Sequence, residues 1–96
     1  MKIIVSYDVS TVDDGGKKRL RQVAKCCKNY GLRVQNSVFE CVLNLTELEL
    51  LRNQLCQIIN KDTDSLRIYL LGNHWINKVE HYGTKEILDV TGSLIL

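Results

Sequence analysis

The sequence predicts a single α+β domain in which an antiparallel sheet carries two helices on one face. The apolar patterns along its 96 residues follow the order strand, helix, one or two strands, helix, strand, which is a βαββαβ arrangement. The length leaves room for one compact domain spanning residues 1–96. A composition of 45% hydrophobic and 25% charged residues with no proline is typical of an ordered globular chain.

The first half of this order is a strand followed by a helix. Residues 2–8 are mostly apolar or β-branched up to Tyr7 and Asp8, and turn-forming polar residues follow, which predicts a buried strand ending in a loop. Apolar residues then recur at helical spacing, at Leu20, Val23, Ala24 and Cys27. This pattern predicts an amphipathic helix over residues 17–30, with Gly31 as its C-cap glycine.

The second half adds the remaining strands and a second helix. Residues 33–45 are rich in valine but carry a polar interruption at 35–37, so we expect one bent strand or two short ones. Residues 46–49 resemble a capping box, and apolar residues at helical spacing continue to residue 59. Residues 65–72 alternate as a strand does, residues 73–86 are mixed, and a weaker pattern over 87–96 predicts a short C-terminal strand.

A homodimer is expected because the helices would leave one face of the sheet uncovered. Six aromatic residues are few for a stand-alone core. Apolar side chains on both sides of the middle strand region would suit packing against a second copy, and they are Val34, Val38, Phe39, Val42 and Leu43. Packing two sheets face to face in a symmetric dimer would bury them.

Several other classes of protein are disfavoured by the sequence. No apolar run approaches membrane-spanning length and the N-terminal segment is charged, so we expect a cytoplasmic protein with no membrane partner. The cysteines lack metal-binding spacing and fall in apolar-periodic segments, which predicts reduced, buried thiols at Cys26, Cys27, Cys41 and Cys56. An RNA-recognition motif is excluded because no strand carries its Gly-aromatic-Val-x-aromatic set.

Positive charge is concentrated in one segment, although the net charge is only +2. Residues 15–33 contain no acid and hold seven of the thirteen basic residues, namely Lys17, Lys18, Arg19, Arg21, Lys25, Lys28 and Arg33. Of these, Lys18, Arg21, Lys25 and Lys28 share one face of the predicted helix. A solvated helix face is the alternative, but such a face usually intersperses acids, so the pattern favours phosphate binding that is salt-sensitive and independent of sequence.

Asp8 is the candidate metal ligand and catalytic residue. Its carboxylate ends the first strand beside a glycine-containing loop, where a hard divalent cation could reach it. A strand-end aspartate is more often a cap, but across a two-fold axis Asp8 would meet its own copy, and two carboxylates can hold a Mg²⁺ that activates water. Asp13 and Asp14 are better explained as helix-capping residues. His74 and His81 lack a metal-binding partner set and are interpreted as solvated loop residues.

The chain resembles the CRISPR-associated protein 2 family over most of its length. Four segments carry the resemblance: Ile4-Val5-Ser6-Tyr7-Asp8-Val9; Arg19-Leu20-Arg21 with Tyr30-Gly31; Arg33-Val34-Gln35-Asn36-Ser37-Val38-Phe39-Glu40; and Asp64-Ser65-Leu66-Arg67-Ile68-Tyr69. The Tyr-Asp strand end is weak alone, but its combination with the Gln-x-Ser-Val-Phe segment at family spacing is specific. The tail resembles the subtype I-C branch.

The resemblance implies a ferredoxin-like homodimer whose two Asp8 carboxylates face each other and bind Mg²⁺ or Mn²⁺. It also implies that residues 83–96 would complete the sheet of the other protomer. The family's other site positions would fall on Tyr7, Arg19, Arg21, Arg33 and Phe39, which add to Lys18 and Lys25 as nucleic-acid-binding candidates. The loop after Asp8 is longer than in compact members, so Ser10 and Asp13 are left out of the ligand set.

Two functions follow from these expectations. In the first, the protein is a metal-dependent endonuclease acting on single-stranded RNA or double-stranded DNA, and it takes part in spacer acquisition with the CRISPR integrase subunit. In the second, it is a non-catalytic DNA-binding scaffold of the integration complex, and Asp8 is vestigial.

Overall fold

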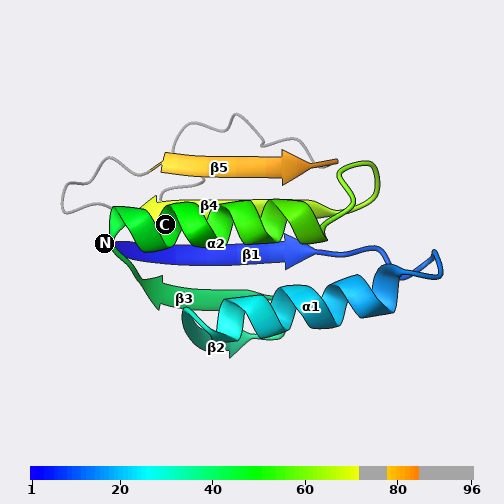
Figure 1. Cartoon of the computed structure of the whole chain (residues 1–96), viewed down its shortest axis with the longest axis horizontal. Coiled ribbons are helices and arrows are strands. Elements are labelled where there is room, and N and C mark those ends of the chain that lie inside the picture. The colour runs from blue at the N-terminus through cyan, green and yellow to red at the C-terminus, as the bar shows by residue number, and fades with distance from the viewer. Residues whose placement is uncertain (72–77, 85–96) are drawn as a thin grey trace.

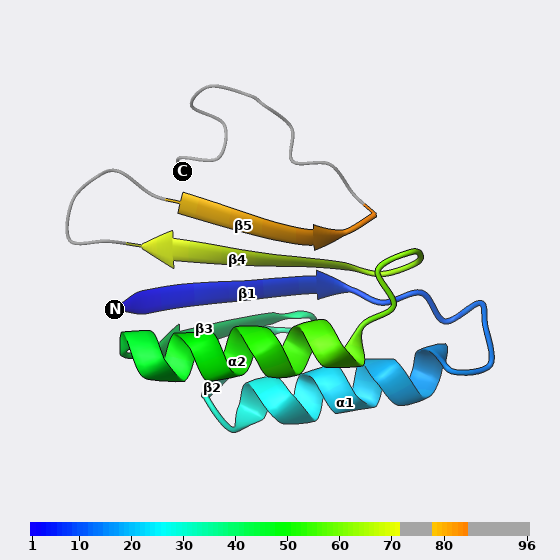
Figure 2. The same ribbon diagram turned by 45° about the horizontal axis from the view of Figure 1, so that its top comes forward.

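The computed structural model describes residues 1–71 and 78–84. One sheet holds five strands, and both helices lie against the same face of it (Figure 1, Figure 2). The elements in chain order are β1 (Lys2–Asp8), α1 (Gly16–Lys28), β2 (Gly31–Gln35), β3 (Val38–Val42), α2 (Leu45–Ile58), β4 (Ser65–Leu71) and β5 (Lys78–Gly83). The predicted α+β, ferredoxin-like βαββαβ fold is confirmed, with β5 added at its edge.

The sheet has the strand order β2-β3-β1-β4-β5, and every neighbouring pair is antiparallel. β1 is the central strand, pairing Val5 with Phe39 of β3 on one side and with Ile68 of β4 on the other. The polar interruption contains a two-residue turn at Asn36 and Ser37, so residues 31–42 form two short strands. A register shift between Arg33 and Gln35 marks a bulge beside that turn.

The core lies between the sheet and the helix pair. Alternation along β1 buries Ile3, Val5 and Tyr7 on the helix side and turns the residues between them to the helix-free face. The fully buried side chains include Ile3, Val5, Val23, Cys27, Phe39, Leu51, Leu55, Leu66 and Ile68. Cys26, Cys27 and Cys41 are buried, Cys56 is half-buried, and all four are free thiols. Neither described helix has the length and apolarity that a membrane crossing requires.

Two local predictions about helix ends are corrected by the structure. Gly31 is not a C-cap, since the helix ends at Asn29 in a right-handed conformation and Gly31 begins β2. A side chain there would collide with the carbonyl of Glu40 on β3, which explains the glycine. The capping box of α2 is formed by Asn44 and Glu47, with reciprocal bonds of 2.8 and 3.0 Å, and not by residues 46–49.

The C-terminal region differs from the expectation in its first half. The sequence pattern predicts no element over residues 73–86, but β5 forms there and pairs with β4 along its whole length. The predicted strand over 87–96, and the pairing of that tail with another protomer, lie outside the described residues. Gly83 ends β5 with a φ of 109°, which favours glycine.

Candidate functional site

Asp8 lies on the helix-free face of the sheet, at the end of β1, and its side chain is exposed. The cross-strand register pairs Asp8 with Ser65 and Ser6 with Arg67, so all four side chains share this face. They surround a small depression of about 120 Å³ that Tyr7 also lines. A carboxylate, two hydroxyls and a guanidinium therefore stand together, and these groups can bind a metal ion and phosphate oxygens.

The donor set of one chain is half of the predicted metal site. A carboxylate is the oxygen ligand that Mg²⁺ and Mn²⁺ favour, so the chemistry of Asp8 fits. Among the described residues, however, no three His, Cys, Asp or Glu side chains gather closely enough to hold a metal ion. The carboxylate of a second copy would be needed to form the predicted pair.

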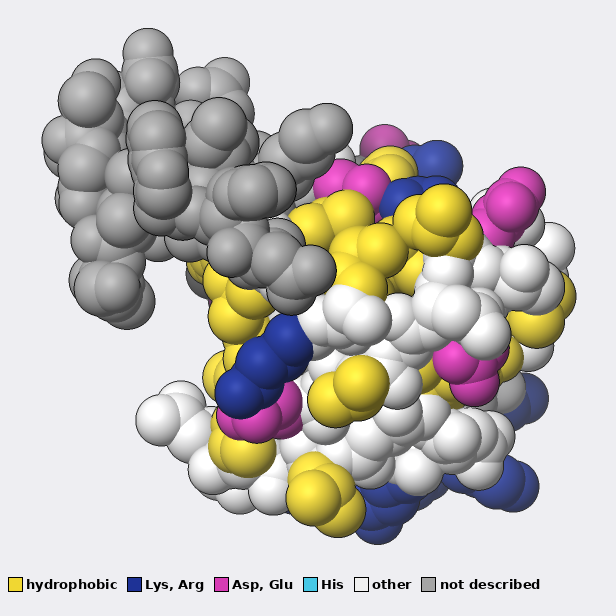
Figure 3. Space-filling view, turned by 90° about the vertical axis from the view of Figure 1, so that its left-hand side faces the viewer, with side chains coloured by type: hydrophobic (Ala, Val, Ile, Leu, Met, Phe, Trp, Pro, Cys, Tyr) yellow, Lys and Arg dark blue, Asp and Glu magenta, His cyan; other side chains and the backbone are white. Residues whose placement is uncertain are grey.

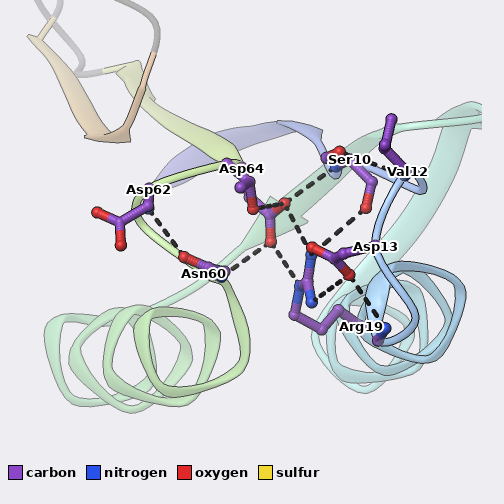
Figure 4. A network of polar contacts seen from close by, with 9 residues as sticks. Ser10, Val12, Asp13, Arg19, Asn60, Asp62 and Asp64 are labelled. Atoms are coloured by element: carbon purple, nitrogen blue, oxygen red, sulfur yellow. Dashed lines mark hydrogen bonds and ion pairs between the residues drawn. The ribbon is translucent and has the colours of Figure 1, made fainter.

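Arg19 is held in a partly buried ion network that joins three segments of the chain (Figure 4). Its Nε donates to Asp64 at 2.9 Å, and its terminal nitrogens donate to Asp13 at 2.9 and 3.0 Å. Asp64 is fully buried and also accepts the backbone N–H groups of Ser10 and Asn60 at 2.9 and 2.8 Å. These bonds give Arg19 a structural role between the loop after β1 and the turn before β4. Its expected contact with nucleic acid stays a prediction.

The network explains the acidity of both carboxyl groups. Burial raises the pKa of Asp64, but the hydrogen bond from Arg19 and the backbone N–H groups outweigh it, and the net pKa lies below its usual value. The hydrogen bonds from Arg19 also lower the pKa of Asp13. Because Ser10 follows Asp8 by two residues, Asp64 fixes the start of the loop that leaves the candidate site.

Asp13 and His81 take positions that differ from their predicted ones. Asp13 does not cap α1, whose N-cap residue is Gly15 without a side-chain bond. Its carboxylate accepts the N–H of Gly15 at 3.0 Å just before the helix and pairs with Arg19. His81 is a half-buried residue of β5 and not a loop residue. His74 lies outside the described residues.

The structure places Tyr7 and Phe39 in the core, and their expected contact with nucleic acid stays a prediction. The exposed fraction is 4% for Tyr7 and zero for Phe39. Their rings stack with centroids 6.2 Å apart, and the Tyr7 hydroxyl donates to the carbonyl of Asn36 at 3.3 Å. Burial raises the pKa of Tyr7. The guanidinium of Arg33 lies 5.1 Å from the centroid of Phe39. The ring of Phe39 therefore stabilises the position of the Arg33 cation at the surface.

The other predicted basic residues are exposed, and two of them meet. Arg21 of α1 and Arg33 of β2 line one depression of about 370 Å³, with Asn36 and Ser37 of the turn at its edge. Lys18 and Lys25 are exposed on α1. Among residues 1–71 and 78–84, none of these four cations belongs to a salt bridge. In the end-on view of Figure 3, Lys and Arg side chains gather at the lower edge, where Figure 1 places α1 and β2.

The structure separates the predicted basic residues Arg21 and Arg33 from Asp8. The Arg21 and Arg33 depression lies on the helix side of the sheet, and Asp8 lies on the opposite face. Tyr7 lines both depressions, so the end of β1 forms the wall between them. Reasoning from the sequence missed Ser6, Ser65 and Arg67 beside Asp8. Their signal was the alternation of β1 and β4, which becomes informative only once the register between the strands is known.

The fold and the site define a class: ferredoxin-like proteins with an exposed carboxylate at the end of the first strand and an acid-free basic helix. The sequence profile of a family described as "CRISPR associated protein Cas2" matches residues 1–79. The chain belongs to this CRISPR-associated Cas2 family.

Relatives and solved structures agree with that assignment. The chain is 53% identical to a CRISPR-associated endonuclease Cas2 of Halalkalibacterium halodurans, with 99% of each chain covered. It is 50% identical to a CRISPR-associated endoribonuclease Cas2 of Nitratidesulfovibrio vulgaris, covering 100% of this chain and 94% of that protein. The crystal structure of Streptococcus pyogenes Cas2 at pH 6.5 matches with a TM-score of 0.70 at 53% identity, covering 78% of this chain and 90% of the other.

Proposed function

We propose that this chain is a CRISPR adaptation protein and a nuclease that acts as a homodimer on RNA or double-stranded DNA. In this proposal the Asp8 carboxylates of two copies hold Mg²⁺ or Mn²⁺, and the protein takes part in spacer acquisition with an integrase partner. The observation that carries the proposal is the exposed Asp8 on the helix-free face of the sheet. The names of the two relatives, an endonuclease and an endoribonuclease, support phosphodiester cleavage.

Exposed apolar side chains on the same face support the homodimer. Leu32 is 77% exposed and Val42 is 76% exposed, and their register partners Glu40 and Lys2 also lie on the helix-free face. Burial of such side chains against a second copy would stabilise a dimer. Because Asp8 shares this face, a two-fold axis there would bring its copy toward it.

Asp8 and the residues around it would have different roles in cleavage. The chemistry that a bound divalent cation supplies is neutralisation of the phosphate charge and activation of water. Arg67, Ser6 and Ser65 would bind the nonbridging phosphate oxygens, since they line the same depression. The exposed cations of α1 would bind other phosphates of the nucleic acid, at a distance from the bond that is cleaved.

A second function, that of a non-catalytic scaffold for double-stranded DNA, is favoured by one specific observation. The depression between Arg21 and Arg33 lies on the helix side of the sheet and contains no contribution from Asp8. Nucleic acid bound there would be held without the carboxylate. In that case Asp8 would be vestigial and the dimer would serve the integrase partner alone.

A cleavage assay separates the two functions. Wild type, Asp8→Ala and Asp14→Ala would be incubated with labelled single-stranded RNA and double-stranded DNA, with Mg²⁺ or with a chelator. Asp14 is the matched control because it is also an exposed aspartate. We expect Mg²⁺-dependent products from wild type and Asp14→Ala and none from Asp8→Ala. Equal activity in all three proteins, or none in any, would leave the scaffold function.

A further inference from the structure

A groove of about 550 Å³ is lined by residues of both helices. Figure 2 shows the two helices side by side on one face of the sheet. Each helix contributes side chains spaced three or four residues apart, which places them in facing stripes. The lining residues are Gln22, Lys25, Cys26, Asn29, Gln54, Gln57 and Ile58. None of these residues lines the depression beside Asp8 or the depression between Arg21 and Arg33. The volume is within the range of small-molecule sites.

Carboxamides dominate the groove chemically. Four of the seven lining residues are Gln or Asn, and each carboxamide offers both hydrogen-bond donors and an acceptor. The thiol of Cys26 and the hydroxyl of Tyr30 both donate to Oε1 of Gln54 at 3.3 Å. This orients the amide and, within the described part of the chain, leaves its Nε2 group without a protein acceptor. Cys26 and Ile58 add apolar surface between the polar groups.

The two helix segments that line the groove carry only positive charge. Residues 15–33, which include α1, contain no acid, and neither do residues 50–61, which include the second half of α2. Lys25 lines the groove, and Lys28 lies one turn further along the same helix. Such surroundings attract a polyanion and disfavour a basic segment. Yet one cation and four amides are a poor lining for a bare phosphate and a good one for a group with mixed donors and acceptors.

We propose that this groove binds unpaired bases of a single-stranded stretch of nucleic acid whose phosphates lie along Lys25 and Lys28. The inference rests on the proposed nucleic-acid binding and adds a site that reads bases. Gln and Asn side chains form paired hydrogen bonds with base edges, and unstacked bases expose those edges in single strands. Cys26 and Ile58 contact the flat faces of the bases.

Three DNA ligands of equal duplex length test the groove by fluorescence anisotropy. One is blunt, one carries a single-stranded extension, and one carries an abasic extension with the same phosphates but no bases. We expect wild type to bind the base-bearing extension about five- to tenfold more tightly than the abasic one. Gln57→Ala and Gln54→Ala should reduce that ratio toward one without changing the salt slope, because amides release no counterions.

Gln35→Ala is the matched control, since it removes an exposed carboxamide from β2, outside the groove. It should keep the wild-type ratio. Equal affinity of wild type for the base-bearing and abasic extensions would overturn the inference. The same result is expected if the groove binds a protein segment and not bases. That result would leave the proposed function intact if all three ligands still bound in a salt-dependent way, whereas absence of any DNA binding would remove both.

Discussion

At the scale of single residues, a buried carboxylate determines the geometry behind the candidate site. Asp64 connects the loop after β1, the start of α1 and the turn before β4 through bonds to Ser10, Arg19 and Asn60. The carbonyl of the same residue accepts the N–H of Thr84 at 3.0 Å beyond β5. Asp64 therefore fixes the segments that surround the end of β1, where Asp8 lies.

Removal of the Asp64 carboxylate should strongly destabilise the protein. Asp64→Ala leaves Arg19 and two backbone N–H groups without their buried acceptor, and breaking a buried pair costs about 3–5 kcal/mol. Urea unfolding at pH 7 measures this decrease in the free energy of unfolding. Asp62→Ala removes an exposed carboxylate two residues away and should change stability by less than about 0.5 kcal/mol. Equal effects of the two substitutions would contradict the role of Asp64.

The lowered pKa of Asp64 also predicts how stability depends on pH. Because the pKa in the folded state lies below that in the unfolded state, the charged carboxylate stabilises the fold. This contribution is complete above the ordinary aspartate pKa of about 3.9 and is lost as pH falls through the folded value. Unfolding free energies measured between pH 6 and pH 2 should fall less steeply for Asp64→Asn than for wild type. Parallel curves would contradict the linkage.

At the scale of elements, α1 is a helix with two different faces. Val23 and Cys27 pack into the core, and Lys18, Arg21 and Lys25 remain exposed without salt bridges in the described part of the chain. The last turn carries Lys25 and Lys28 beside the negative end of the helix dipole, which stabilises the helix itself. The exposed face therefore accumulates charge that only an external anion would neutralise.

Alanine substitution of Lys18, Arg21 and Lys25 together should weaken DNA binding and flatten its salt dependence. The slope of log affinity against log salt should fall by about 0.9 for each phosphate that the variant no longer neutralises, and alanine preserves the helix. Affinity titrations at four salt concentrations would measure the slope. Lys61→Ala, which removes an exposed lysine outside α1, should keep the wild-type slope. An unchanged slope in the triple variant would exclude this face as the binding surface.

How far the sequence predicted these elements depends on how local their causes are. The helices and the strands from β1 to β4 were predictable because their periodicity is strong within each segment. β5 was missed because its residues pair with β4 and show little pattern of their own. The same limit applies to the site. The place of Asp8 at the strand end and of Arg21 on the exposed helix face followed from local pattern. The burial of Tyr7 and Phe39 and the pairing of Arg19 with Asp64 depend on interactions between distant segments.

At the scale of the whole molecule, the two faces of the sheet differ in what covers them. Both helices lie on one face (Figure 2), and Leu32 and Val42 are exposed on the other. Exposed apolar side chains gathered on one face mark an interaction surface. A second copy placed there would bury this face and bring two Asp8 side chains toward the same axis.

Leu32→Asp should shift the protein from dimer to monomer if the helix-free face forms the interface. A charge introduced into a buried apolar interface costs several kcal/mol, enough to dissociate a dimer at micromolar concentration. Sedimentation equilibrium would measure the mass. Val12→Asp is the control, because Val12 is 95% exposed in the loop before α1. A dimeric Leu32→Asp protein would place the interface elsewhere.

The central position of β1 has a consequence for how the chain is made. β1 is the first strand in the sequence, yet it needs β3 and β4 on its two sides, and its pairing reaches from Lys2 to Leu71. During synthesis from the N-terminus, the strand that carries Asp8 keeps an unpaired edge until residues 65–71 have emerged. The hairpin of β2 and β3 closes over two residues and can form early. Assembly of the sheet therefore includes a late step, in which β4 pairs with the free edge of β1, the first strand of the chain.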